Sequence, residues 1–466
     1  MIKFGTGGWR AIIADEFTKE NIRLLAQALS NKMLAEGAKE IVIGFDRRFL
    51  SDVGAKWAAE VFAGNGITPM VIEKNAPTPL IMFAVKYYNY QYGMSVTASH
   101  NPAIYNGIKI FTAGGRDADQ SVTKIIEELA EQVTEIKSVD YDKAISEGKI
   151  KIIEPFNDYI DSVLGMLDLK SVRNRNLKVL LDPMFGVSKT SLQTILLTAR
   201  CEVDIINDRH DTLFGGRLPS PSAATLTRLS DLVKEEKYDI GIATDGDADR
   251  IGIIDEFGRF IHPNEIMLLL YYYLTKFKGW RGDVVRNLAT THVLDKIAED
   301  YGQKCHEVPV GFKYISSKME ETDSILGGES SGGLTIKGHI KGKDGIFAAA
   351  LLVEMMCVTH KSLSTILKDI YEKYGYMVMS EADFKFSNEK KAELMKLLFE
   401  DKQVPTFEEE IEKVSYMDGL KIYFKNGEWI IARFSGTEPL IRIFCEMPSM
   451  EIAKKTSDEM IAFLGL

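Results

Sequence analysis

Residues Tyr92–Lys109 read YGMSVTASHNPAIYNGIK and place a serine between two segments of strand character. Tyr92–Val96 has the composition of a strand, and Tyr105–Lys109 leads into another short strand. Ser99 is therefore expected on a loop at the C-terminal end of a strand. Ligands bind along that edge in open α/β sheets, so this stretch indicates both an α/β fold and the place of a site within it.

Ser99 is a candidate nucleophile, and its neighbours favour attack on phosphorus over attack on a carbonyl carbon. The serine turn of esterases needs small residues, usually glycine, two positions before and after the serine. Thr97 and Asn101 occupy those positions here. Because His100 directly follows Ser99, we expect its side chain to point away and to form no local Ser–His pair. The alternative is a polar turn without chemistry.

Three carboxylates, at Asp245, Asp247 and Asp249, alternate along five residues between two apolar segments. In an extended loop of period two they would converge on one hard cation, and Mg²⁺ could take a further ligand from a phosphate group. A calcium loop is disfavoured because its sixth position requires glycine and is Arg250 here, and because its flanks look like strands instead of helices. The remaining alternative is a solvated acidic turn.

The glycine-rich segment GGESSGG at residues 327–333 is a candidate sugar-binding loop. Its glycines let the backbone approach a ligand closely, and its carboxylate and hydroxyl groups can pair with sugar hydroxyls. The carboxylate is Glu329, and the two hydroxyl groups are Ser330 and Ser331. A flexible hairpin tip is the alternative.

The segment RFSGTEP at residues 433–439 is a candidate phosphate-binding loop between two predicted strands. An arginine fork, hydroxyl groups and backbone N–H groups near a glycine are suitable donors to a phosphate. The alternative is a hairpin whose arginine reaches solvent. The predicted phosphate ligands are Arg433, Ser435, Gly436, Thr437 and Arg442.

Apolar runs of strand length alternate with amphipathic stretches along the 466 residues, which indicates α/β layers, and the length suggests three to four domains. Boundaries are expected near residues 138–148, after residues 255–258 and near residues 374–375. The last stretch differs, with helices around antiparallel strands. Predicted strands include 41–45, 68–72, 179–181 and 203–206, and predicted helices include 55–63, 119–133, 266–274, 345–356, 389–398 and 451–463.

The four motifs, in this order, resemble those of the α-D-phosphohexomutase family, which comprises phosphoglucomutases and phosphomannomutases. Residues 4–10 (FGTGGWR), 44–48 (GFDRR) and 310–315 (VGFKYI) resemble further segments of that family. The resemblance implies three similar α/β/α domains and a C-terminal α+β domain around a central cleft. The expected domains are 1–145 (phosphoserine), 146–256 (metal), 257–373 (sugar) and 374–466 (phosphate).

The resemblance also implies roles for individual residues. Ser99 would carry a phosphoryl group and, with Asp245, Asp247 and Asp249, bind Mg²⁺. Glu329 and Ser331 would contact sugar hydroxyls, and the loop at 433–437 would hold the phosphate that is not reacting. The residues expected to line the cleft beside Ser99 are His100, Lys109, Arg10 and Arg250. His100 and Lys109 are both candidates for the group that moves the hydroxyl proton.

The implied activity is the interconversion of hexose 1-phosphate and hexose 6-phosphate through a 1,6-bisphosphate, with glucose the expected hexose and glucose 1,6-bisphosphate an activator. A phosphomannomutase or a dual enzyme is the alternative. Glucose and mannose differ in the orientation of one hydroxyl group, and the residues of these loops do not show which orientation is bound. Phosphoglucosamine mutase is less favoured, since the sugar loop lacks the family's histidine. A Mg²⁺-dependent phosphatase and a catalytically silent binder are alternatives from other classes.

Composition fits an ordinary soluble enzyme, which is expected to be cytoplasmic. Its expected partner is a small sugar phosphate, as the resemblance implies, and the chain is expected to be a monomer or a homodimer. The chain has 57 basic and 67 acidic side chains and a net charge of -10, which disfavours nucleic-acid binding. The four cysteines lack metal-ligand spacing and are expected to be buried thiols. No apolar signal core follows Met1, and the apolar run at 266–274 is too short to span a membrane.

Overall fold

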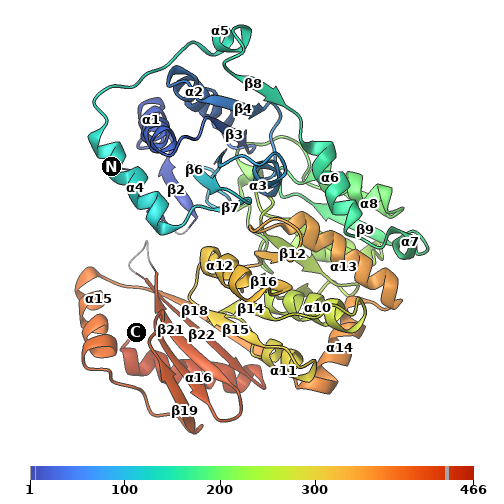
Figure 1. Cartoon of the computed structure of the whole chain (residues 1–466). Helices are drawn as coiled ribbons and strands as arrows, with labels where there is room; N and C mark the ends of the chain where they lie inside the picture. The colour runs from blue at the N-terminus through green and yellow to red at the C-terminus, as the bar shows by residue number, and fades with distance from the viewer. Residues whose placement is uncertain (1, 6, 436–439) are drawn as a thin grey trace.

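The computed structural model describes residues 2–5, 7–435 and 440–466, which form four sheets in chain order. Figure 1 shows the first domain in blue and the fourth in red, with the second and third beside them in green to orange. Gly436 and Thr437, two of the predicted phosphate ligands, lie outside the described residues.

The first sheet has the strand order β1-β2-β6-β5-β3-β4-β8, with β7 paired to β6. Strands β5, β3, β4 and β8 are parallel, and β6 runs antiparallel to β5. Both faces of β3 are covered, because Ile41 and Ile43 pack in one core and Val42 in another. Such strands read as continuous apolar runs. The strands are β1 (Phe4–Gly5), β2 (Gly8–Ile12), β3 (Glu40–Phe45), β4 (Thr68–Ile72), β5 (Tyr92–Val96), β6 (Tyr105–Thr112), β7 (Arg116–Asp117) and β8 (Lys151–Ile153).

Helices flank this sheet on both sides. Helices α1, α2 and α4 contribute to the core that contains Ile41 and Ile43, and α3 contributes to the core that contains Val42. Strand β8 pairs with β4, so the first sheet receives a strand from beyond residue 145. The helices of this part are α1 (Lys19–Ala35), α2 (Ser51–Gly64), α3 (Thr78–Tyr87), α4 (Gln120–Gln132) and α5 (Tyr141–Ser146).

The second and third sheets repeat the scheme in smaller form, with orders β10-β9-β11-β12-β13 and β15-β14-β16-β17. In each, the last parallel strand is followed by an antiparallel partner, as β5 is by β6. The strands are β9 (Lys178–Asp182), β10 (Glu202–Ile205), β11 (Ile240–Thr244), β12 (Ile251–Ile254), β13 (Phe260–Ile261), β14 (Val284–Asn287), β15 (Cys305–Val308), β16 (Leu326–Gly328) and β17 (Leu334–Ile336).

Helix α13 (Gly345–Thr359) lies in the interior that the second and third domains share. Nearly all of its residues are buried, including Glu354. The Glu354 carboxylate accepts hydrogen bonds from Tyr273 Oη (2.5 Å), Lys278 Nζ (2.6 Å) and the backbone N–H of Asp168 (2.6 Å). The other helices here are α6 (Phe156–Gly165), α7 (Leu169–Val172), α8 (Lys189–Thr198), α9 (Thr227–Glu235), α10 (Pro263–Lys276), α11 (Val293–Asp300), α12 (Phe312–Thr322) and α14 (Leu363–Tyr374).

The fourth domain is an antiparallel sheet of order β18-β22-β21-β20-β19 with its own core. Helices α15 (Asn388–Met395) and α16 (Met450–Leu464) add apolar side chains to that core. The predicted helices around antiparallel strands are therefore confirmed. The strands are β18 (Val378–Lys385), β19 (Ile411–Ser415), β20 (Leu420–Phe424), β21 (Trp429–Phe434) and β22 (Leu440–Met447).

The predicted strands and helices named above are all confirmed, with shifts of a few residues at their ends. The cysteines are free thiols, of which Cys305 is only half-buried. Within the described residues, no single helix has the length and apolarity to cross a membrane; α13 and α14 meet the test only as a pair, bent by 80°.

Replacing Glu354 with alanine should destabilise the shared core, because three hydrogen-bond donors lose their buried acceptor. We expect a loss of about 3 kcal/mol or more, seen as a fall of about 5 °C or more in the midpoint of thermal unfolding. The matched control is Glu372→Ala, whose exposed carboxylate forms an ion pair with Lys368 at the surface. Equal midpoints for the two variants would contradict this role of Glu354.

Candidate active site

The loop that carries Ser99 leaves the C-terminal end of β5, as predicted, and a buried arginine holds its shape. Arg48 donates hydrogen bonds to the carbonyl oxygens of Ser99 (2.7 Å) and Asn101 (2.6 Å). It also donates to those of Pro102 (2.9 Å) and Tyr105 (3.0 Å). Ser99 itself has a φ of 52°, a left-handed conformation that a non-glycine residue adopts only when its surroundings enforce it.

The Ser99 hydroxyl faces the second domain. Ser99 Oγ donates a hydrogen bond to Asp245 Oδ2 at 2.9 Å. His100 Nδ1 lies 3.4 Å from the same Oγ, so the expectation that His100 points away from its neighbour is wrong. The left-handed turn at Ser99 explains the difference, because it brings together two consecutive side chains that an extended backbone would separate.

Asp245, Asp247 and Asp249 converge as predicted, but through a turn instead of an extended loop. The N–H of Ala248 donates to the carbonyl of Asp245 (3.1 Å), and Ala248 has a φ of 63°. The turn places one ligand oxygen of each carboxylate within 4.8 Å of the others, and all three residues are buried.

Two lysines from other domains supply positive charge to the triad. Lys109 Nζ, on β6, donates to Asp247 Oδ2 and Asp249 Oδ2, both at 2.7 Å. Lys343 Nζ, in the loop before α13, lies 2.9 Å from Asp249 Oδ2. Burial opposes the charged form of Lys109, but the two carboxylates outweigh it and hold its pKa above the ordinary value.

The triad remains electrostatically crowded. Burial, and then the charges of Asp247 and Asp249, hold the pKa of Asp245 well above its usual range. For Asp249, burial is outweighed by Lys109 and Lys343, so its pKa lies well below the usual range. Two ammonium groups against three carboxylates leave one negative charge without a counter-ion among these five side chains.

The donor set fits a hard divalent cation. Among the described residues, Asp247 Oδ1 and Asp249 Oδ1 are buried without a hydrogen-bond partner, and Asp245 Oδ2 accepts a hydrogen bond only from the Ser99 hydroxyl. Buried carboxylate oxygens without a partner are costly unless a cation binds them. Carboxylate oxygens with an open position are the ligands that Mg²⁺ prefers.

Arg10 and His100 lie beside the serine loop. Arg10 Nη1 donates to Asn101 Oδ1 at 2.6 Å. Arg250, followed by burial and Arg10, lowers the pKa of His100 well below its ordinary value, so its imidazole is neutral. Arg250 also donates its backbone N–H to Asp245 Oδ1 (3.0 Å). The structure thus places all four residues predicted beside Ser99 next to the Ser99 loop or the triad: His100, Lys109, Arg10 and Arg250.

The predicted sugar loop joins β16 to β17 and touches the metal loop. Gly333 forms an isolated bridge with Arg250, and the carbonyl of Gly332 accepts the N–H of Ile251 (3.2 Å). Glu329 is buried and its Oε1 accepts from the N–H of Gly311 (2.9 Å). Ser331 is exposed.

The predicted phosphate loop joins β21 to β22. Arg433 Nε donates to Asp418 Oδ2 (2.8 Å), which also accepts the N–H of Val310 (3.0 Å) from the third domain. Arg442 lies directly opposite Arg433 in the sheet, so both side chains project from one face. Ser435 stands at the end of this strand pair, where its N–H donates to the carbonyl of Leu440 (2.9 Å).

A cavity of about 380 Å³ lies between Lys109 and Arg433, and neither Ser99 nor the aspartate triad lines it. Its walls come from the first, third and fourth domains. The charged residues among its lining are Lys109, Asp117, Lys313, Asp418 and Arg433.

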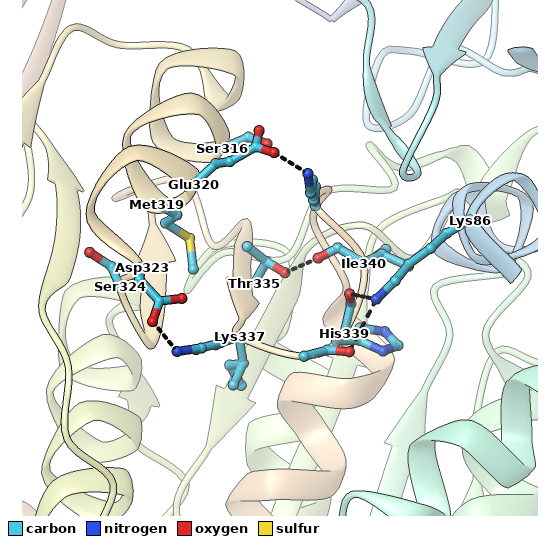
Figure 2. A pocket seen from close by; sticks show the side chains of 13 residues that line it. Lys86, Ser316, Met319, Glu320, Asp323, Ser324, Thr335, Lys337, His339 and Ile340 are labelled. Atoms are coloured by element: carbon cyan, nitrogen blue, oxygen red, sulfur yellow. Dashed lines mark hydrogen bonds and ion pairs between the residues drawn. The ribbon is translucent and has the colours of Figure 1, made fainter. Parts of the chain in front are cut away.

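A second cavity, of 240 Å³, lies between α12 and the loop at 337–341 and contains none of the predicted site residues. Figure 2 shows Lys86 reaching into this region from α3. Lys86 Nζ donates to the carbonyl oxygens of Gly338 (3.1 Å) and His339, which ties the first domain to the third.

Sequence reasoning missed three residues of the site. Arg48 stands in the GFDRR segment, to which the resemblance gave no role. Thr78 Oγ1 donates to Asp247 Oδ2 (2.6 Å) from the start of α3. Lys343 directly precedes Asp344, the N-cap of α13. A lysine just before an Asp-Gly helix start is the sequence feature from which Lys343 could have been found.

The Ser99 hydroxyl faces a candidate cation site, and the arginines of the predicted phosphate loop lie in another domain. Phosphoryl transfer depends on such positioning and on positive charge around the phosphoryl group. Domain models of the phosphoglucomutase/phosphomannomutase family match the chain in order. Alpha/beta/alpha domains I, II and III match residues 1–137, 157–258 and 262–374, and the C-terminal domain matches residues 389–463. The chain belongs to this family, the α-D-phosphohexomutases.

Relatives agree on the family and differ in the hexose. A phosphoglucomutase/phosphomannomutase of Thermococcus kodakarensis is 31% identical over 460 residues, which cover 97% of this chain and 96% of the relative. A phosphoglucosamine/phosphogalactosamine mutase of Sulfurisphaera tokodaii is 30% identical over 463 residues, 98% of each chain. A crystal structure assigned as a phosphomannomutase from Thermus thermophilus has a TM-score of 0.88 at 29% identity, covering 100% of this chain and 99% of that chain.

Adding Mg²⁺ to chelator-treated protein should raise its thermal midpoint, because the cation binds only the folded triad. At about a hundred times the dissociation constant the gain is about 2.7 kcal/mol. Asp247→Asn should remove most of this Mg²⁺-dependent increment, measured by calorimetric scans with and without Mg²⁺. Asp231→Asn, an exposed position on α9, is the control and should keep it. An unchanged increment in Asp247→Asn would rule out the triad as the metal site.

Proposed function

We propose that this enzyme interconverts hexose 1-phosphate and hexose 6-phosphate, with glucose the preferred hexose, through a phosphoserine at Ser99 and a 1,6-bisphosphate. The observation that carries the proposal is the hydrogen bond from Ser99 Oγ to Asp245 Oδ2 inside a buried carboxylate triad. A hydroxyl so placed is held against a cation site at the position where a phosphoryl group would be carried.

We assign the four proposed domains, 1–145, 146–256, 257–373 and 374–466, to the phosphoserine, the metal, the sugar and the phosphate. Each contributes one loop that joins two antiparallel strands. Ser99 and the three aspartates would hold Mg²⁺. When bound, the cation would neutralise charge on the phosphoryl oxygens and orient the group for in-line transfer.

The chain's own residues then account for the transfer. The bond between Ser99 Oγ and phosphorus breaks while a free sugar hydroxyl bonds to phosphorus. The hydroxyl proton passes to the neutral His100, whose Nδ1 lies 3.4 Å from Ser99 Oγ and can return the proton to that leaving oxygen. Lys109 is already held as an ammonium by Asp247 and Asp249 and has no place for a further proton. Lys109 and Lys343, already at the triad, face the place where a phosphoserine would add about two negative charges. Arg10 and Arg250 add further positive charge beside Ser99.

The second half of the reaction returns the other phosphate of the bisphosphate to Ser99 after the sugar has reversed its orientation. A cradle that contacts only phosphate serves both orientations. Arg433, Arg442 and Ser435 provide such contacts, and Glu329 and Ser331 would bind sugar hydroxyls in either orientation. Glucose 1,6-bisphosphate would act as activator by phosphorylating Ser99.

The alternative is a phosphomannomutase or a dual enzyme, because the relatives bear several hexose names. A Mg²⁺-dependent phosphatase using the same serine would release phosphate without isomerisation. The buried state of Ser99, which is 1% exposed, favours transfer to a bound sugar over transfer to water.

Ser99→Ala should lower turnover by a factor of about 10³ or more, because the phosphoryl carrier is lost. The assay couples glucose 6-phosphate formation from glucose 1-phosphate to a dehydrogenase, with Mg²⁺ and a trace of glucose 1,6-bisphosphate. Intact-mass and peptide mapping of active wild-type protein should find one phosphoryl group on the peptide that contains Ser99. Ser146→Ala, an exposed position on α5, is the control. Isomerisation that persists in Ser99→Ala would refute the proposal.

Glucose phosphates should give a higher kcat/KM than mannose or glucosamine phosphates when the three are compared at one Mg²⁺ concentration. The reason is the sugar loop, which lacks the histidine of the family's phosphomannomutase/phosphoglucomutase members, resembles the glucose-preferring form and offers Glu329 and Ser331. Free phosphate is measured in the same reactions. A preference for mannose or glucosamine would reassign the hexose, and phosphate release without isomer formation would establish a phosphatase.

A further inference from the structure

A buried lysine joins the fourth domain to the third at a place that the reaction itself does not use. Lys421, on β20, is 1% exposed. Its Nζ donates to the carbonyl of Leu288 (2.7 Å) and to Glu307 Oε2 (2.6 Å), both in the third domain. The third contact is His292 Nε2 at 3.0 Å. Three acceptors thus match the three hydrogens of one ammonium group.

The Nζ of Lys421 is held in a defined position, although burial and then the charge of Arg286 lower its pKa to about 7. Burial lowers the pKa of His292 to about 3, so its ring is neutral. With Nδ1 donating to the carbonyl of Gly427 (3.2 Å), its Nε2 is left to accept from Lys421. Nζ also lies 4.1 Å from the centre of the Trp429 ring, a cation–π contact.

The acceptor side of this contact is fixed within the third domain. Glu307 Oε2 also accepts from Arg286 Nη1 (2.5 Å), and Arg286 pairs with both oxygens of Asp295 (2.9 and 3.0 Å). A second bond across the domains runs from the N–H of His292 to Glu446 Oε2 (2.8 Å), on β22. Lys421 therefore binds to a rigid group instead of a mobile surface side chain.

This contact is close along the chain to the residues that hold Arg433. Glu307, on β15, lies three residues before Val310, and Asp418 lies three residues before Lys421, on β20. The two segments are thus joined twice, by Lys421 with Glu307 and by the N–H of Val310 with Asp418 Oδ2. Asp418 in turn holds Arg433.

We propose that Lys421 is a positioning residue for phosphate binding, which fixes the fourth domain against the third so that Arg433 faces the cleft. This inference rests on the proposed function for its kinetic consequence. Its structural consequence, a fixed distance between the two domains, does not depend on any activity.

The test compares Lys421→Met with Lys425→Met, an exposed lysine of the same domain that pairs only with Glu410 among the described ion pairs. We expect Lys421→Met to raise KM for glucose 1-phosphate about tenfold with kcat changed less than about twofold, and the control to match wild type. Glu307→Gln, a milder change, should give a smaller rise in KM. It replaces Lys421→Met as the deciding variant if the latter fails to fold by circular dichroism.

A distance measurement separates positioning from activity. Spin labels on cysteines introduced at Lys368, on α14, and Glu412, on β19, report the separation of the third and fourth domains; both positions are exposed. We expect a narrow distance distribution in the parent protein and a broader or shifted one with Lys421→Met. If both KM and the distribution stay unchanged, or if only kcat falls, the positioning role is overturned. A parent protein without mutase activity but with a distribution that responds to Lys421→Met would refute the proposed function and leave the positioning role standing.

Discussion

Buried negative charge at Asp245, Asp247 and Asp249 is the constraint on which the assembly of the first three domains depends. Like charges this close repel by about 3–4 kcal/mol per pair at an effective dielectric constant of about 20. Within the turn, the charge of Arg250 relieves part of this repulsion, and its backbone N–H also binds Asp245 Oδ1. The direct ion pairs come from Lys109 in the first domain and Lys343 in the third. The loop of Asp245, Asp247 and Asp249 therefore attracts the first and third domains electrostatically. Because Lys109 lies on β6, the strand that follows the Ser99 loop, this attraction also brings Ser99 to the triad.

The geometry of the sheets lets these loops meet. In each of the first three domains, the functional loop leaves the last parallel strand and returns along an antiparallel one, so each loop lies at the same edge of its sheet. Close approach then depends on glycine. A Cβ at Gly246 would lie 2.7 Å from the carbonyl oxygen of Ser99, and one at Gly332 would lie 2.8 Å from that of Ile251. Both glycines stand where one domain's loop presses against another's backbone, which explains why the motifs contain glycine without invoking ligand contact.

The sequence predicted the local features well because each rests on short-range chemistry. Apolar runs, caps and turn residues fixed the strands and helices, and residue type alone identified the serine, the aspartates and the arginine. What failed depends on backbone conformation or on distant parts of the chain. The left-handed turn at Ser99 reverses the expected direction of His100, and Ala248 turns a loop that a period of two predicts to be extended. Arg48 and Lys421 are buried cations whose partners lie far away in sequence, so no local pattern distinguishes them from surface basic residues.

One short backbone segment connects the proposed sugar loop with the proposed phosphate loop. The N–H of Gly311 binds Glu329, the carboxylate of the sugar loop, and the N–H of the preceding Val310 binds Asp418, which holds Arg433. Two consecutive peptide groups thus connect Glu329, proposed to contact sugar hydroxyls, with Arg433, proposed to contact phosphate. A shift of the fourth domain would move Asp418 and with it the segment that carries the partner of Glu329. In the proposed reaction a bisphosphate binds in two opposite orientations, and this connection would let the protein, instead of the bound end of the sugar, set the spacing between the two groups.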